Sequence, residues 1–230
     1  MSFDLYVFDL DGTLVDTAPD LAASLNHALV CLARPPVPVD SVRHMVGHGA
    51  RRLLEHGLAA TGDVSADLVE QGVAPFLAHY SANIAVGSHP FDGVEAALDR
   101  LAGQGARLAI CTNKPEALAR KLVAELGWDT RFAALLGADS RPWRKPDPRH
   151  LQDTMAAAGG GKTLYIGDSR TDADTARAAC VPFVLVTFGY SSEPVAAMGA
   201  DALIDHFDAL DLAAHTIQSR LTAAAASARS

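Results

Sequence analysis

The sequence predicts an α/β chain built on an open, doubly wound parallel sheet, interrupted by an all-helical insertion. Short runs of Val, Ile, Leu and aromatic residues are apolar almost continuously, which is typical of parallel strands covered on both faces. Between them lie stretches with apolar residues at spacings of three and four, each ending near Gly, which indicate helices. Strands that alternate with helices form a sheet with helices on both faces.

Six segments are predicted strands: residues 4–9, 107–112, 133–137, 163–168, 182–187 and 200–204. The segments "GVEAALDRLAGQG" and "KPEALARKLVAELG" are examples of the helices expected between them.

The interval from about Asp16 to Val86 breaks the alternation. It has helical periodicity and no convincing strand, and the Pro-rich "RPPVPVD" within it indicates a turn. We expect hinges near residues 13–17 and 85–90. The predicted division is therefore an α/β core of residues 1–15 and 87–230 and a helical cap of residues 16–86.

Composition limits the class of protein. The chain has 230 residues, of which 49% are hydrophobic and 20% charged, as in ordinary globular proteins. The net charge of −8 argues against a nucleic-acid partner, and no secretory signal or apolar run suited to a membrane is seen. The three cysteines lack metal or redox spacing, which indicates a reducing, cytoplasmic location. The sequence leaves monomer and homodimer open.

Polar side chains gather where three predicted strands end, and parallel strands bring their carboxyl ends to one edge of a sheet. These residues are Asp9 and Asp11 after the first strand, Thr112, Asn113 and Lys114 after the second, and Asp168, Ser169 and Asp172 after the fourth, with Lys145 supplied by the Pro-fixed loop "RPWRKPDP". We interpret this edge as a site.

The carboxylates of this edge predict a bound cation. Two like charges 4 Å apart repel by about 4 kcal/mol at an effective dielectric near 20, so Asp9, Asp11 and Asp168 need a counter-charge. Oxygen ligands without His or Cys nearby favour Mg²⁺ over Zn²⁺. Mg²⁺ and Lys145 together would attract a small anionic phosphate ester despite the negative total charge.

Four ordered segments, "DLDGT", "CTNK", "RKPDP" and "GDSRTD", resemble the four motifs of the haloacid dehalogenase (HAD) superfamily of phosphotransferases. The resemblance covers nearly the whole chain and implies a Rossmann-like core with a cap between the first two motifs. The resemblance implies that Asp9 is the nucleophile, which forms an aspartyl-phosphate, and that Asp11 acts first as acid and then as base. It implies that Lys145 balances charge and that Thr112 and Asn113 bind the phosphoryl group. It also implies that Asp9, Asp168 and the Asp11 carbonyl bind Mg²⁺, with Asp172 behind them. Two residues apart in an extended chain, Asp9 and Asp11 point to the same side.

Within this superfamily, several activities can be compared. Dehalogenases lack the second Asp of the first motif, and phosphonate-cleaving members use a cap lysine, whereas all four lysines of this chain lie outside the cap. A sugar-phosphate mutase similar to β-phosphoglucomutase stays open, because it uses the same two aspartates. A binding protein that has lost catalysis is disfavoured, since the nucleophile, acid, lysine and metal-binding acid are all present.

The segments "FDLDGTLVDTAPDLAASLN" and "VGHGARRLL" resemble bacterial phosphoglycolate phosphatases, which implies hydrolysis of 2-phosphoglycolate to glycolate and phosphate. Sugar phosphates, pyrophosphate and nucleotides are alternative substrates. We expect the substrate carboxylate to need a cation from the cap, because the phosphate occupies the charges of the core. Arg43, Arg51 and Arg52 are candidates, on a Gly-flanked loop that could close over the site, unless they belong to a solvated helix face. His48, between two glycines, could also reach inward.

Overall fold

A six-stranded parallel sheet lies at the centre of the chain, which the computed structural model describes over residues 3–43, 45, 49–191 and 193–227. The strand order is β5-β4-β1-β6-β7-β8. The strands are β1 (Leu5–Phe8), β4 (Arg107–Cys111), β5 (Ala134–Leu136), β6 (Thr163–Gly167), β7 (Phe183–Val186) and β8 (Ala202–Ile204). Each falls within one of the six predicted segments, and the predicted fold class is confirmed.

Alternate residues of the central strand face opposite layers, as the two-residue period of a strand requires. Leu5 and Val7 belong to the apolar cluster that includes helices α7 (Pro148–Ala157) and α8 (Arg170–Ala179). Tyr6 and Phe8 belong to the cluster on the other face. That face is covered by α5 (Val94–Gly103), α6 (Glu116–Glu125) and α9 (Leu210–Ser227). Two short 3₁₀ helices, η1 (Val195–Ala197) and η2 (Phe207–Ala209), lie in the segments between β7 and α9. The sheet is thus covered on both sides, and the near-continuous apolar runs are explained.

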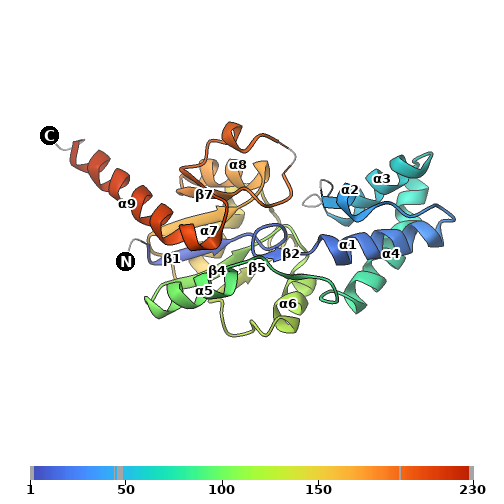
Figure 1. Cartoon of the computed structure of the whole chain (residues 1–230), viewed down its shortest axis with the longest axis horizontal. Helices are drawn as coiled ribbons and strands as arrows, with labels where there is room; N and C mark the ends of the chain where they lie inside the picture. Colours follow the sequence, from blue (N-terminus) through green and yellow to red (C-terminus); the bar gives the residue numbers. More distant parts are fainter. Residues whose placement is uncertain (1–2, 44, 46–48, 192, 228–230) are drawn as a thin grey trace.

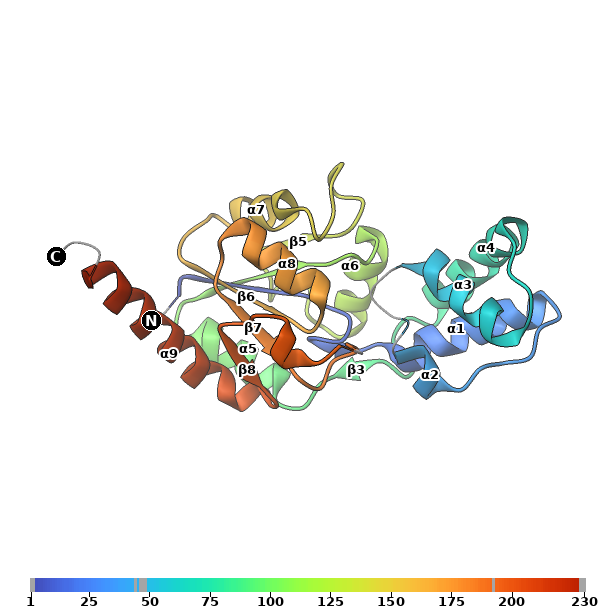
Figure 2. The same ribbon diagram turned by 90° about the horizontal axis from the view of Figure 1, so that it is seen from above.

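The helical insertion lies beyond the carboxyl ends of the strands, on the right of Figure 1 and of the rotated view in Figure 2. Its helices are α1 (Ala18–Cys31), α2 (Val39–Arg43), α3 (Ala50–Thr61) and α4 (Ala66–Ala82). Helix α1 packs along α4, and α3 packs on both. The described residues between 17 and 88 form no strand, as the periodicity predicts.

The two segments that connect the insertion to the sheet pair with each other. Strand β2 (Val15–Asp16) is antiparallel to β3 (His89–Pro90), at the positions where we expected hinges but no strands. The buried Asp20 carboxylate reinforces this crossing, because it accepts hydrogen bonds from the backbone N–H groups of Gly87 and Ser88 at 2.8 Å. The root of the insertion is therefore held by backbone pairing and by a buried carboxylate.

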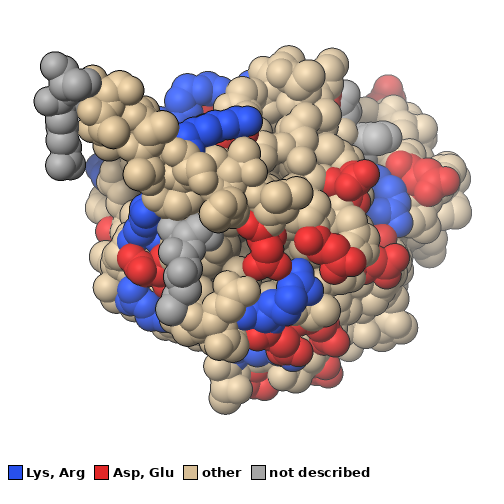
Figure 3. Space-filling view, turned by 60° about the vertical axis from the view of Figure 1, so that its left-hand side comes forward, with Lys and Arg blue, Asp and Glu red and all other residues tan. Residues whose placement is uncertain are grey.

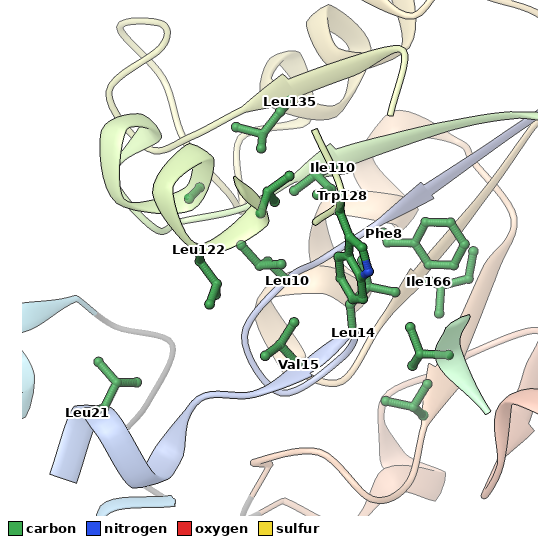
Figure 4. Packing of buried hydrophobic residues seen from close by; sticks show 14 of the residues in the cluster. Phe8, Leu10, Leu14, Val15, Leu21, Ile110, Leu122, Trp128, Leu135 and Ile166 are labelled. Carbon is green, nitrogen blue, oxygen red and sulfur yellow. The ribbon is translucent and has the colours of Figure 1, made fainter. Parts of the chain in front are cut away.

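One apolar cluster continues from the sheet into the root of the insertion (Figure 4). Phe8 and Ile110 come from central strands, Leu14 from the turn after β1, and Leu21 from the first turns of α1. Trp128 is buried against this cluster, and its indole N–H donates to the Glu95 carboxylate at 3.1 Å. This continuity fixes the start of α1 relative to the sheet.

On the face shown in Figure 3, basic side chains are scattered among acidic ones. Across the described residues, no helix combines the length and the apolar character needed to cross a bilayer.

Candidate active site

A cavity of about 600 Å³ separates the carboxyl ends of the strands from helices α3 and α4. Its core side includes Asp9, Asp11, Thr112, Asn113, Lys145 and Asp168, and its cap side includes Arg51, Phe76 and Tyr80. The structure therefore brings the residues predicted from three strand ends and from the Lys145 loop to one place.

The turn after β1 requires a glycine. Gly12 has a φ of +82°, and a Cβ atom there would lie 2.6 Å from Oδ2 of Asp168, which is closer than such atoms can approach. The Gly12 N–H donates to the Val15 carbonyl at 2.9 Å, so the chain reverses immediately after Asp11. This geometry lets the backbone of the first motif pack directly against the Asp168 carboxylate.

Lys145 lies at the centre of the buried charges. Its Nζ is 3.0 Å from Oδ1 of Asp9 and 2.7 Å from Oδ1 of Asp172, and it donates to the Tyr165 hydroxyl at 3.1 Å. Burial would lower the pKa of Lys145, but the charges of Asp172 and Asp9 raise it above its ordinary value. The lysine thus stays charged beside the Asp9 carboxylate.

Both carboxylate oxygens of Asp172 accept hydrogen bonds. Its Oδ1 accepts from Lys145 and from the Tyr165 hydroxyl at 2.6 Å, and its Oδ2 accepts from the Ser169 N–H at 3.1 Å and hydroxyl at 2.5 Å. Burial alone would raise the pKa of Asp172, but Lys145 and these hydrogen bonds lower it below its ordinary value. With Ser169, it also forms the capping box of α8. Its contacts indicate that Asp172 holds Lys145 in place.

An acidic cluster at this edge can hold a divalent metal ion. Asp9, Asp168 and Asp172 each offer a carboxylate oxygen, and these oxygens lie within 4.8 Å of one another. Asp168 is oriented by the Thr13 hydroxyl at 3.0 Å and the Tyr190 N–H at 2.8 Å. The oxygen donor set suits a hard cation.

The raised pKa values of two carboxyl groups in this cluster also indicate a site suited to a cation. Burial raises the pKa of Asp9 to about 7 despite the neighbouring Lys145. Burial, and then the charges of Asp172 and Asp9, raise the pKa of Asp168 to about 8. A divalent cation among these groups would favour their ionised forms, because it supplies the charge that the protein alone lacks.

Sequence reasoning placed Lys114 at this edge but gave it no role. The structure shows the Lys114 Nζ 2.9 Å from Oδ1 and 3.2 Å from Oδ2 of Asp11, and 2.5 Å from the Tyr80 hydroxyl on α4. Burial would lower the pKa of Lys114, but Asp11 and Tyr80 raise it above its ordinary value. The only signal in the sequence was its position directly after Thr112 and Asn113. Its contact with the distant Tyr80 could not be read from that position.

The two predicted phosphoryl ligands are placed differently. Thr112 is buried and lines the cavity. The Asn113 amide donates to the Lys145 carbonyl at 3.0 Å, and its buried Oδ1 has no partner among the described residues. The side chain of Asn113 thus anchors the loop that carries Lys145.

The predicted cap cations do not form one group. Arg51 lines the cavity, but it pairs with Glu70 at 2.6 Å and its side chain is 60% exposed. Arg52 also lines the cavity and pairs with Glu55 at 2.7 Å. Arg43 does not line it. His48 lies outside the described residues.

Arg43 instead binds Asp16 through two hydrogen bonds of 3.1 and 2.8 Å. Of the three candidate arginines, Arg43 is thus the one that is directed away from the cavity. The physical reason is that Asp16, in strand β2, offers this guanidinium a bidentate carboxylate partner.

Comparison with known proteins agrees with this geometry. Residues 3–179 match the model of the haloacid dehalogenase-like hydrolases, and the chain belongs to this family. It is 47% identical to a phosphoglycolate phosphatase of Mesorhizobium japonicum over 91% of this chain and 94% of that protein. It is 49% identical to one of Caulobacter vibrioides over 87% of this chain and 86% of the relative. The crystal structure of a predicted phosphoglycolate phosphatase from Haemophilus somnus superposes with a TM-score of 0.84 at 30% identity, covering 91% of this chain and 97% of the other. The predicted resemblance is confirmed, and the chain is a phosphoric monoester hydrolase by class.

Proposed function

We propose that this protein hydrolyses 2-phosphoglycolate to glycolate and phosphate in a Mg²⁺-dependent reaction. The observation that carries the proposal is the placement of Asp9, which lines a cavity of about 600 Å³ with Lys145 3.0 Å behind it and Asp11 in the same wall. The full-length relatives named phosphoglycolate phosphatase support the choice of substrate.

The chemistry follows from the two carboxylates of the first motif. In the first step an oxygen of Asp9 attacks phosphorus, the bond from phosphorus to the ester oxygen breaks, and Asp11 gives its proton to the leaving oxygen. In the second step Asp11 takes a proton from water, whose oxygen attacks phosphorus and releases Asp9 and phosphate. Hydrolysis of such esters is extremely slow without a catalyst, and enzymes remove on the order of 20 kcal/mol from the barrier.

The remaining residues stabilise charge around the phosphoryl group. Lys145 balances charge on Asp9 and on the phosphate, while Thr112 and Asn113 contribute hydroxyl and backbone N–H donors. Asp9, Asp168 and the backbone carbonyl of Asp11 would hold Mg²⁺. When bound, this ion would neutralise negative charge at the phosphoryl group.

The division into core and cap completes the proposal. We place its boundaries at residues 15/16 and 86/87, at β2 and just before β3. The helical cap would exclude water from the cavity and would supply Arg51 to the substrate side. The cap would thus close over the substrate, while the core supplies the chemistry.

Phosphate release from a substrate panel tests this proposal. The panel contains 2-phosphoglycolate, glucose 1-phosphate, pyrophosphate and a nucleotide, each measured with Mg²⁺ and again with chelator. We expect a Mg²⁺-dependent preference for 2-phosphoglycolate. A flat or sugar-led profile would contradict the substrate, and activity that persists in chelator would contradict the metal.

A further inference from the structure

We infer that Lys114 is the residue that recognises the carboxylate of the substrate, with Tyr80 holding its ammonium in position. This inference rests on the proposed function, because it concerns the carboxylate that distinguishes phosphoglycolate from a simple alkyl phosphate. It moves carboxylate recognition from the cap arginines to a lysine of the core.

The cations that line the cavity differ in burial. Among the described residues they are Arg51, Arg52, Lys114, Arg144, Lys145 and Arg170, and the two lysines are the buried ones. Lys145 is committed to Asp9 and Asp172. Lys114 is therefore the buried cation of the cavity that is not placed beside the proposed nucleophile.

Its distance from Asp11 places Lys114 beside the leaving group. Asp11 must come within hydrogen-bond distance of the ester oxygen to protonate it. In phosphoglycolate the carboxylate carbon is two bonds beyond that oxygen. An ammonium 2.9 Å from Asp11 is thus within reach of the carboxylate while the phosphoryl group lies at Asp9.

Because it is buried, Lys114 can distinguish a substrate with a carboxylate from one without it better than Arg51 or Arg52 can. Its residue is 6% exposed, so its charge acts with little screening by water. Arg51 and Arg52 have side chains 60% and 66% exposed and already pair with Glu70 and Glu55. Lys114 is paired as well, with Asp11, so the difference is exposure: water screens the charge of an exposed cation, which therefore contributes little to selectivity.

Tyr80 links this recognition to the cap. Its hydroxyl is 2.5 Å from the Lys114 Nζ, which also lies 4.5 Å from the centre of its ring. Tyr80 is 2% exposed and belongs to α4, on the opposite wall of the cavity. A core lysine whose position is fixed by a cap side chain makes carboxylate recognition depend on the placement of the cap. Tyr80 is accordingly a positioning residue.

The test compares two substrates that differ at the carboxylate. The value of kcat/KM is measured for 2-phosphoglycolate and for ethyl phosphate, which has a methyl group in place of the carboxylate, in the wild type and in Lys114→Met, Lys114→Gln, Lys114→Arg, Tyr80→Phe and Arg51→Gln. The readout is the ratio of the two kcat/KM values. Effects of Lys114 on Asp11 alone act on both substrates, and at least as strongly on ethyl phosphate, whose leaving group is the more basic, so they do not lower this ratio. Circular dichroism and melting curves establish that each variant is folded.

We expect the ratio to fall about 10- to 100-fold in Lys114→Met and Lys114→Gln, the effect of removing one charge-assisted hydrogen bond. Lys114→Arg should recover part of the preference, Tyr80→Phe should lose several-fold, and Arg51→Gln should change the ratio less than either neutral Lys114 variant. An unchanged ratio in both neutral variants would overturn the inference, as would a larger fall in Arg51→Gln. If instead the wild type does not prefer 2-phosphoglycolate, the proposed function itself fails, so the two failures are distinguishable.

Discussion

The Tyr190 hydroxyl lies 2.7 Å from Oδ1 of Asp16, and this contact joins strand β2 to the segment after β7 that orients Asp168. The same hydroxyl accepts hydrogen bonds from the N–H groups of Thr17 at 2.6 Å and Ala18 at 2.9 Å. The backbone N–H of Tyr190 donates to Asp168. One residue thus contacts both the root of the cap and the acidic cluster.

Replacing Tyr190 by Phe should lower the free energy of unfolding by about 1–3 kcal/mol, because the buried Asp16 carboxylate and the N–H groups of Thr17 and Ala18 lose their partner. Urea unfolding of Tyr190→Phe, Asp16→Asn and the double variant measures this effect. We expect the double variant to lose less than the sum of the single losses, since the two side chains form one network. Additive losses, or no loss in Tyr190→Phe, would show that the contact is energetically unimportant.

Asp172→Asn should lower kcat/KM about 10- to 100-fold while the fold is retained, because Lys145 loses one of its two carboxylate partners and its position is less well fixed. Asp174 provides a matched control on the same helix. It forms an exposed pair with Arg177 at 2.8 Å, so Asp174→Asn should leave kcat/KM within about two-fold. Equal effects of the two substitutions on phosphate release would contradict the role given to Asp172.

His150 should make stability depend on pH. It is fully buried, with the backbone of Gly137 beside its ring. Burial, and then the charge of Lys145, lower its pKa to about 4 from an ordinary value of 6.5. The unfolded chain therefore binds more protons between these values. This contribution to stability is complete above pH 6.5 and is lost as the pH falls toward 4, by about 1.4 kcal/mol per pH unit at most.

Urea unfolding from pH 7.5 to 4.5 measures this dependence in the wild type and in His150→Phe. The carboxylates contribute a background common to both proteins, so the difference between the two curves isolates His150. The wild type should lose more stability than the variant across this range. Parallel curves would contradict the assignment.

Much of the fold could be predicted because it depends on local patterns. Near-continuous apolar runs predicted the six strands, and spacings of three and four predicted the helical insertion. The pairing of β2 with β3 was missed. Each of these strands is two residues long, too short for a periodic pattern, and their partners are distant in sequence.

The residues of the site could also be predicted only where they depend on local patterns. Asp9, Asp11, Thr112, Asp168 and Lys145 follow strand ends or occupy a motif, so the topology of a parallel sheet brings them together. The contacts of Lys114 with Tyr80 and of Arg43 with Asp16 depend on how the insertion packs. No local pattern encodes such contacts. Of the candidate cap arginines, Arg51 and Arg52 line the cavity and Arg43 does not, a difference that the sequence could not show.

The most direct test of the central claim is phosphate release from 2-phosphoglycolate, with Mg²⁺, by the wild type and by Asp9→Asn. Asn has nearly the shape of Asp but cannot act as a carboxylate nucleophile. The account predicts that turnover falls by about a thousand-fold or more, while circular dichroism and the melting curve show a folded protein. Substantial turnover in a folded Asp9→Asn variant would contradict Asp9 as the nucleophile.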